Sequence, residues 1–199
     1  MKYNLTLSAI VFLLSILVIS CNKGNKETSF STNEIVKTDF GEYRVFNNEK
    51  HGYKINIPLK WAYTFKKNTI LIAQNPKGNK TDFRETMDVV KVDGGFTFDG
   101  NNEVNNKVDL NKFFEDHLYD LSITDFQTEV EGRGEKIING VDAKWAVLKD
   151  KRERHDIRVI KYFYSDDENI YIVTGSMMEN DFAVQGPIFN EIAESFVIL

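Results

Sequence analysis

The sequence predicts a domain of the α+β class, in which helices pack against antiparallel strands. Three observations support this prediction: consecutive strand patterns between Lys136 and Met177, an amphipathic helical pattern from Leu110, and a second helical pattern after Pro187. A chain of 199 residues with 42% hydrophobic content is long enough for one such domain with appended segments.

The central strands are predicted from a turn signal and from periodicity. Asn139-Gly140 separates two apolar runs, and a type I′ turn needs positive φ at both of its central positions. Alternate positions from Val141 to Val147 are apolar, which is the period of a strand with one buried face. The next two segments, 157–165 and 170–176, are joined by a short polar turn. We therefore expect three consecutive antiparallel strands.

The remaining elements are predicted from the same kinds of signal. Strand patterns cover residues 43–46, 53–57, 69–74 and 85–92. Asp109 is expected to cap the first helix, and Pro187 suits the first turn of the last helix. Residues 197–199 are expected to form a short strand or a packed tail. Both tryptophans, Trp61 and Trp145, are expected to be largely buried.

Residues 1–20 have the layout of a secretory signal peptide. Lys2 gives a short positive region, and the apolar run from Leu7 to Ile19 is too short for a stable membrane span. Cys21 directly follows Val18-Ile19-Ser20, which resembles the lipobox of bacterial lipoproteins. We therefore expect cleavage before Cys21 and attachment of acyl chains such as palmitate, which anchor the protein stably. An ordinary signal peptide or a plain N-terminal anchor helix is the alternative interpretation.

The composition of the chain indicates where the folded domain begins and excludes some kinds of ligand and chemistry. Residues 21–39 are polar and predict a flexible tether, so the globular domain is expected to cover residues 40–199. The net charge of −5 argues against a nucleic-acid binder, which needs a basic patch to neutralise phosphates. Since Cys21 is the one cysteine, no disulfide forms within the chain, and no other thiolate serves a metal or catalysis.

Several motifs resemble those of a known family. Residues 53–61 read Y-K-I-N-I-P-L-K-W, similar to the opening Y-x-I-x-x-P-x-x-W of the Mog1/PsbP/DcrB-like superfamily. Matching features follow in the family's order: a mid-chain helix, I-N-G-V-D-A at 138–143, Y-I-V-T-G at 171–175 and E-S-F-V at 194–197. The resemblance covers residues 40–199 and implies an α/β/α sandwich with a single antiparallel sheet flanked by helices. It implies no catalytic residues, because the family has no common set.

No residue pattern predicts a catalytic centre, a cofactor site or a metal site. His51, His117 and His155 lack the paired spacing of metal ligands, and His117 is expected at the edge of the core. Two acidic segments, 99–103 and 166–168, have the oxygen-rich composition of a cation site, but a solvated loop and a tight turn explain them better.

Aromatic residues gather on the predicted central strands, at Tyr162, Phe163, Tyr164 and Tyr171. They suit a ligand or partner groove, because tyrosine is enriched at interfaces. The alternative is that helices cover both faces of the sheet and that these rings form its core. We favour the core interpretation.

The favoured function is that of a non-enzymatic binding or accessory factor for another component of the cell envelope. The protein is expected to be lipid-anchored through Cys21 on the extracytoplasmic side of a cell membrane or outer membrane, with an envelope protein as its partner. The long polar loop Asp93–Asn106 is the expected contact region, because loops carry function on a rigid scaffold. Two alternatives stay open: a small hydrolase or metal-dependent enzyme, and a structural spacer or surface antigen.

Overall fold

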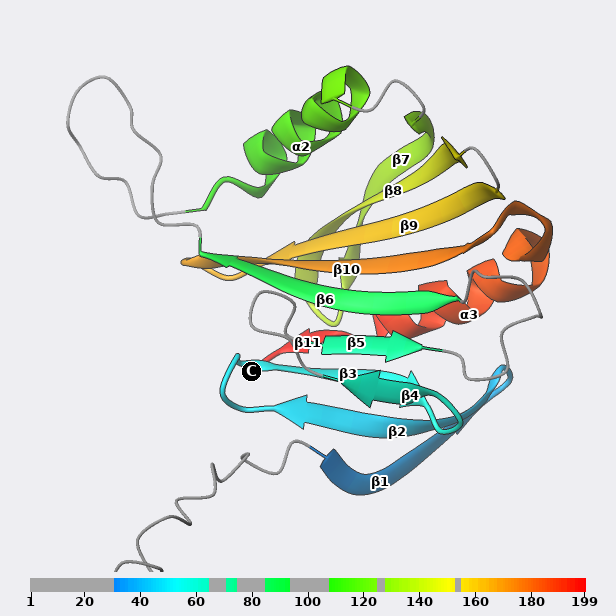
Figure 1. Cartoon of the computed structure of the whole chain (residues 1–199). Helices are drawn as coiled ribbons and strands as arrows, with labels where there is room; N and C mark the ends of the chain where they lie inside the picture. Colours follow the sequence, from blue (N-terminus) through cyan, green and yellow to red (C-terminus); the bar gives the residue numbers. More distant parts are fainter. Residues whose placement is uncertain (1–30, 65–70, 75–84, 94–107, 125–127, 153–154) are drawn as a thin grey trace, which may run out of the picture. The chain divides into compact units, whose positions relative to one another are not determined.

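The computed structural model describes residues 31–64, 71–74, 85–93, 108–124, 128–152 and 155–199 (Figure 1). The strands are β1 (Ser31–Thr38), β2 (Gly41–Asn48), β3 (Tyr53–Pro58), β4 (Ala62–Thr64), β5 (Leu71–Gln74), β6 (Thr86–Asp93), β7 (Thr128–Ile138), β8 (Val141–Arg152), β9 (His155–Ser165), β10 (Asn169–Met178) and β11 (Val197–Ile198). The helices are α2 (Leu110–Thr124), the 3-10 turn η1 (Glu179–Asp181) and α3 (Phe182–Glu194).

The described strands form two antiparallel sheets. The larger has the order β4-β5-β6-β10-β9-β8-β7, and the smaller has the order β1-β2-β3-β11. The predicted α+β class is confirmed, but the strands are not joined in the single sheet that the family resemblance implied. They separate where β3 ends at Pro58, which lacks the N–H group needed to continue a ladder. The amide of Trp61 then donates to the Pro58 carbonyl over 2.9 Å, and this turn leads the chain into β4 of the larger sheet.

A helix covers each face of the larger sheet (Figure 1). Under α2 lies a cluster of buried apolar side chains, namely Leu110, Phe114, Leu118, Ala146, Leu148, Phe163, Ile170 and Ile172. On the opposite face, the Phe189 ring of α3 lies directly over Gly175 of β10. The Tyr164 hydroxyl of β9 donates to the Ala193 carbonyl of α3 over 2.6 Å. The expected sandwich of helices around a sheet is therefore present in the larger sheet.

An aromatic cluster joins the two sheets. The Phe196 ring lies with its centroid 5.4 Å from Tyr53 of β3, 4.8 Å from Tyr164 of β9 and 5.4 Å from Tyr171 of β10. All four of these side chains are buried. The core interpretation of the strand aromatics is confirmed, because Tyr162 and Phe163 are buried as well.

The predicted Asn139-Gly140 hairpin is confirmed, and its turn has a second role. Asn139 has φ 52° and Gly140 has φ 81°, the left-handed values that a type I′ turn requires. The Asn139 Nδ2 atom also donates to the carbonyls of Glu194 and Phe196, over 2.9 Å in each case. The β7–β8 turn is thereby tied to the end of α3.

The N-terminal boundary of the domain differs from the sequence prediction. Residues 31–38 form β1, which pairs with β2, whereas residues 21–39 were expected to be a tether and the domain to begin at residue 40. Composition did not reveal this strand because it lies at a sheet edge, where Ile35 is 43% exposed and Lys37 forms an ion pair with Glu42. Residues 1–30 lie outside the described part of the chain.

The last helix begins earlier than predicted. It starts at Phe182, so Pro187 lies inside α3 rather than in its first turn. The first turn is fixed by packing, because the Arg158 guanidinium lies 5.0 Å from the centre of the Phe182 ring. The predicted tail is confirmed as β11, which pairs with β3.

Both tryptophans are mostly covered, as predicted, although neither is fully buried like the core side chains. The Trp145 indole lies over Gly132 and Gly134 of β7, and a Cβ atom on Gly134 would be 2.9 Å from the indole Nε1. Among the described strands none follows β7 in the sheet, so these strands offer little to cover the outer side of this ring. Trp61 makes an edge contact with Phe189, with the ring centroids 5.5 Å apart.

Candidate functional site

The residues that the sequence singled out do not converge on one site in the described structure. Cys21 and residues 94–106 of the predicted contact loop lie outside the described residues, so lipidation of Cys21 stays a prediction. None of the described helices has the length and apolar character needed to cross a membrane. Within the same residues, no group of three or more His, Cys, Asp or Glu side chains is placed to hold a metal ion.

The three histidines lie on three different elements. His51 lies in the β2–β3 turn, where its carbonyl accepts a hydrogen bond from the Tyr171 hydroxyl over 3.0 Å. Partial burial lowers the pKa of His51, and the charges of Lys50 and Lys91 lower it further. His155 begins β9, and His117 lies on α2. The structure therefore gives these side chains separate surroundings.

The acidic turn at residues 166–168 is explained by its own hydrogen bonds. Asp166 Oδ1 accepts from the amides of Glu168 and Asn169 over 2.8 and 2.6 Å, and Oδ2 accepts from the Tyr171 hydroxyl over 3.3 Å. Burial alone would raise the pKa of Asp166, but these hydrogen bonds and one from the Asn169 side chain outweigh it and lower the pKa. The carboxylate shapes the hairpin turn, as the sequence interpretation favoured.

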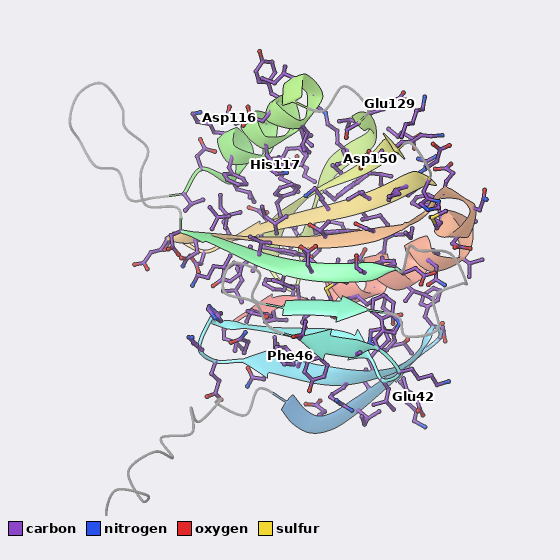
Figure 2. All side chains as sticks on the ribbon, viewed as in Figure 1. Glu42, Phe46, Asp116, His117, Glu129 and Asp150 are labelled. Atoms are coloured by element: carbon purple, nitrogen blue, oxygen red, sulfur yellow. The ribbon has the colours of Figure 1, made fainter. Side chains whose placement is uncertain are left out.

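His117 lies on the side of α2 that faces the sheet, whereas Asp116 lies on the exposed side (Figure 2). Its ring stacks on Phe113 at 6.0 Å and meets the edge of Phe163 at 5.3 Å. The buried Nε2 atom has no hydrogen-bond partner among the residues that the structure describes. The pKa of His117 is lowered to about 4, chiefly by burial and also by the nearby charge of Lys161, against a smaller opposing effect of Asp120. The prediction of a core-edge histidine is confirmed.

This environment predicts that His117 makes the domain less stable in acid. Its pKa is about 4 in the fold and 6.5 when unperturbed, so the unfolded chain binds more protons between these values. Stability is therefore full above pH 6.5 and falls as the pH drops towards 4. Because the ring is partly exposed, we expect a loss of only about 1–2 kcal/mol.

The measurement is denaturant unfolding from about pH 7.5 to about pH 4, comparing the unchanged protein with His117→Gln. The His117→Gln variant should lose about 1–2 kcal/mol less on acidification. The control variant, His155→Gln, should keep the full pH dependence. Equal pH dependence in the unchanged protein and His117→Gln would show that the neutral, desolvated state assigned to His117 is wrong.

Two hollows lie between α2 and β7, a strand that this helix contacts. The first, of 720 Å³, lies between the start of α2 and the β7–β8 turn, with Asn111, Lys136 and Ile137 among its lining residues. The second, of 540 Å³, lies between the middle of α2 and the first half of β7, with Tyr119 and Val130 in its lining. We refer to the two together as the α2–β7 groove.

The α2–β7 groove gathers exposed apolar side chains. Three of the eight large hydrophobic residues that are exposed in the described part of the chain line it, namely Tyr119, Val130 and Ile137, and a fourth, Ile123, lies one turn beyond Tyr119 on α2. Tyr119 is 65% exposed and Ile137 is 73% exposed, while Leu118 forms a buried apolar wall. Apolar residues grouped in this way at the surface mark sites of interaction more often than scattered ones do.

The groove is bounded by a sheet edge. β7 is the last strand of the larger sheet and pairs only with β8 among the described strands. An ion pair between Arg133 of β7 and Glu115 of α2, 2.8 Å long, joins the two sides of the second hollow. A register shift between Val130 and Gly132 marks a bulge in β7 beside the second hollow. The outer edge of β7 therefore presents backbone N–H and C=O groups beside an apolar hollow.

Sequence reasoning did not find this site, although part of it was visible. Tyr119 and Ile123 lie four residues apart on α2, outside the stripe of residues that pack on the sheet. A second apolar stripe on an amphipathic helix is a signal of an exposed contact surface. The part of the groove that β7 forms could not be recognised in this way, because only residues 136–138 of this strand were predicted from the sequence.

An antiparallel sheet with a helix on each face defines the Mog1/PsbP/DcrB-like fold, and solved structures confirm it for this chain. PsbP (CyanoP) from Synechocystis sp. PCC 6803 matches with a TM-score of 0.55 and 14% identity, over 79% of this chain and 92% of its own. LpqN of Mycobacterium tuberculosis, involved in cell envelope biogenesis, matches with a TM-score of 0.57 and 11% identity, over 73% of this chain and 82% of its own. At such identities the likeness shows the fold alone.

A third match is PA94 from Pseudomonas aeruginosa, a protein of unknown function. Its TM-score is 0.52 at 13% identity, over 79% of this chain and 97% of its own. Neither the protein-family models nor the curated proteins compared with the sequence contain a match. The fold predicted from the motif order is thus confirmed by structure, without support from close sequence relatives.

Proposed function

We propose that this protein is a lipid-anchored envelope protein that acts by binding another envelope component, with the α2–β7 groove as its contact surface. The observation that carries the proposal is the gathering of exposed apolar side chains beside β7, whose outer edge pairs with no other described strand. A contact surface built on a helix and a strand suits recognition, because its residues lose little conformational freedom when a partner binds. The groove replaces the Asp93–Asn106 loop as the proposed contact region.

Two further observations support an envelope accessory role. The lipobox-like Val18-Ile19-Ser20 before Cys21 favours export and anchoring. Of the structurally similar proteins, LpqN is involved in cell envelope biogenesis. A hydrolytic function receives less support, since the described histidines lie apart and the hydroxyls of Tyr162 and Tyr164 are bonded to α3.

The anchor is tested by mass spectrometry and fractionation. Protein purified from its own membranes should yield an N-terminal peptide that begins at Cys21 and carries a diacylglyceryl group. Cys21→Ser should leave the membrane fraction, because the acyl chains supply the membrane affinity. A mature protein that lacks Cys21, or a Cys21→Ser variant that stays in the membrane, would contradict the anchoring.

The contact surface is tested by placing a photo-crosslinking amino acid at Tyr119 in the full-length protein in its own cells. We expect a defined adduct with an envelope protein from this position. Val184 of α3 is the matched control, because it is 67% exposed and lies on the helix that covers the opposite sheet face. Adducts of equal yield at Tyr119 and Val184, or none at Tyr119, would contradict the assignment of the groove.

A further inference from the structure

The two helices are held to the larger sheet by different kinds of contact. α3 is fastened by hydrogen bonds, since the side chains of Tyr162, Tyr164 and Asn139 all donate to groups on its last turns. α2 rests on the sheet through its apolar cluster and through the ion pair between Glu115 and Arg133. Because both side chains of this pair are more than half exposed, the pair contributes little. The docking of α2 therefore depends on apolar burial, and its release would leave the contacts of α3 in place.

A row of polar side chains crosses the sheet face on which α2 lies. Lys161 of β9 lies opposite Thr174 of β10, which in turn lies opposite Asp88 of β6. Opposite residues share a sheet face, and Phe163, two residues beyond Lys161, belongs to the cluster under α2, so the row lies on this face. The Thr174 hydroxyl donates to the Asp88 carboxylate. The charge of Asp88 therefore acts on Lys161 only from the far side of Thr174.

His117 brings a second ionisable group to the same place from α2. Its ring meets the edge of Phe163 at 5.3 Å, and the charge of Lys161 acts on it. Its buried Nε2 atom has no hydrogen-bond partner among the described residues. A proton on His117 would therefore place a second positive charge beside that of Lys161, in an apolar contact that offers the new N–H group no described acceptor.

The other charged groups at this contact do not offset the repulsion. The strands under α2 present further charged side chains on the same face, namely Lys144 and Asp150 of β8 and Arg133 and Glu135 of β7. Lys144 pairs with Glu135, as Arg133 pairs with Glu115. The pKa of His117 responds instead to Lys161, which lowers it, and to Asp120, which raises it by less.

Asp120 and Lys161 belong to different sides of the contact. Asp120 lies three residues after His117 on α2, so the two move together, whereas Lys161 stays on the sheet. Separation of α2 from the sheet would thus end the repulsion between His117 and Lys161, return water to the His117 ring and keep the attraction of Asp120. A protonated His117 therefore favours the separated state.

We propose that protonation of His117 releases α2 from the larger sheet, so that acid uncovers an apolar face that the domain keeps hidden at neutral pH. The sheet residues of this face are Ala146, Leu148, Phe163, Ile170 and Ile172. The strands and α3 keep their packing during the release, because their mutual contacts do not include α2. This inference does not depend on the binding function proposed above.

The pH range of the release follows from the two states of His117. The pKa is about 4 when α2 is docked and returns towards 6.5 when the ring is hydrated, so the separated state binds more protons between these values. Release should therefore begin below pH 6.5 and increase as the pH falls towards 4.

The test is amide hydrogen exchange of the full-length protein in detergent at about pH 7.5 and about pH 5, corrected for the pH dependence of intrinsic exchange. Protection of the α2 amides should fall about tenfold or more on acidification, while that of β9 and β10 should change less than about twofold. His117→Gln should abolish the fall, because glutamine does not titrate. The control His155→Gln should retain it. His117→Leu gives the same test should His117→Gln fail to fold, because the ring's neighbours Phe113 and Phe163 are apolar.

A further variant isolates the repulsion. Lys161→Gln should reduce the loss of α2 protection at about pH 5, because it removes the like charge beside His117. Equal losses of protection in α2, β9 and β10 would show global unfolding and overturn a local release. Unchanged α2 protection, or a fall that persists in both His117 variants, would overturn the role of His117. An undiminished fall in Lys161→Gln would overturn the repulsion as its cause.

Discussion

Phe196→Ala should lower the free energy of unfolding by about 3–5 kcal/mol. The Phe196 side chain is 1% exposed and contacts the rings of three tyrosines, which come from both sheets. Truncation removes the buried apolar surface and leaves a cavity that strands on both sides prevent from collapsing. Denaturant unfolding at neutral pH measures the loss.

The matched control for Phe196→Ala is Phe40→Ala, at a phenylalanine that is 52% exposed. Its truncation should change the free energy of unfolding by no more than about 0.5 kcal/mol. A loss below about 1 kcal/mol for Phe196→Ala would show that the aromatic cluster does not hold the sheets together.

Gly175→Ala should destabilise the domain by about 1–3 kcal/mol through overpacking. A Cβ atom at Gly175 would lie 2.3 Å from the Phe189 ring, which is itself buried between α3 and β10. The ring has no free side to move to, so α3 must shift away from the sheet. The matched control is Gly186→Ala, where the new Cβ atom meets only the Phe182 ring at 3.5 Å.

Gly186→Ala should be neutral or stabilising by up to about 1 kcal/mol, because alanine favours the helix.

A second test separates the steric conflict between Gly175→Ala and the Phe189 ring from a general effect of the substitution. In a Phe189→Leu background, Gly175→Ala should cost less than it does alone, giving a coupling of about 1 kcal/mol or more. Additive costs of the two substitutions would contradict direct contact between Gly175 and Phe189.

The elements that the sequence predicted well are those with a strong local signal. Asn139-Gly140 can be recognised without knowledge of the fold, because positive φ at both positions suits few residues. Helix α2 was predicted from its apolar spacing and from Asp109, which accepts a hydrogen bond from the Lys112 amide over 3.0 Å. Both signals depend on interactions within a few residues of chain.

The elements that the sequence missed depend on distant pairing. β1 and the first part of β7 are polar strands at sheet edges, where little apolar surface is buried and periodicity is weak. The split into two sheets also depends on pairing, since β11 joins β3 across more than half of the chain. For the same reason the α2–β7 groove was hidden: whether a strand lies at an edge is decided by topology.

Residues 194–198 close the fold, because contacts from both sheets meet on this one short segment. Phe196 supplies the ring between the sheets, β11 completes the smaller sheet, and the carbonyls of Glu194 and Phe196 accept hydrogen bonds from the Asn139 side chain. A chain shortened before residue 194 would lose all of these contacts together. We therefore expect such a chain to keep its strand-forming segments but not the packing of one sheet on the other.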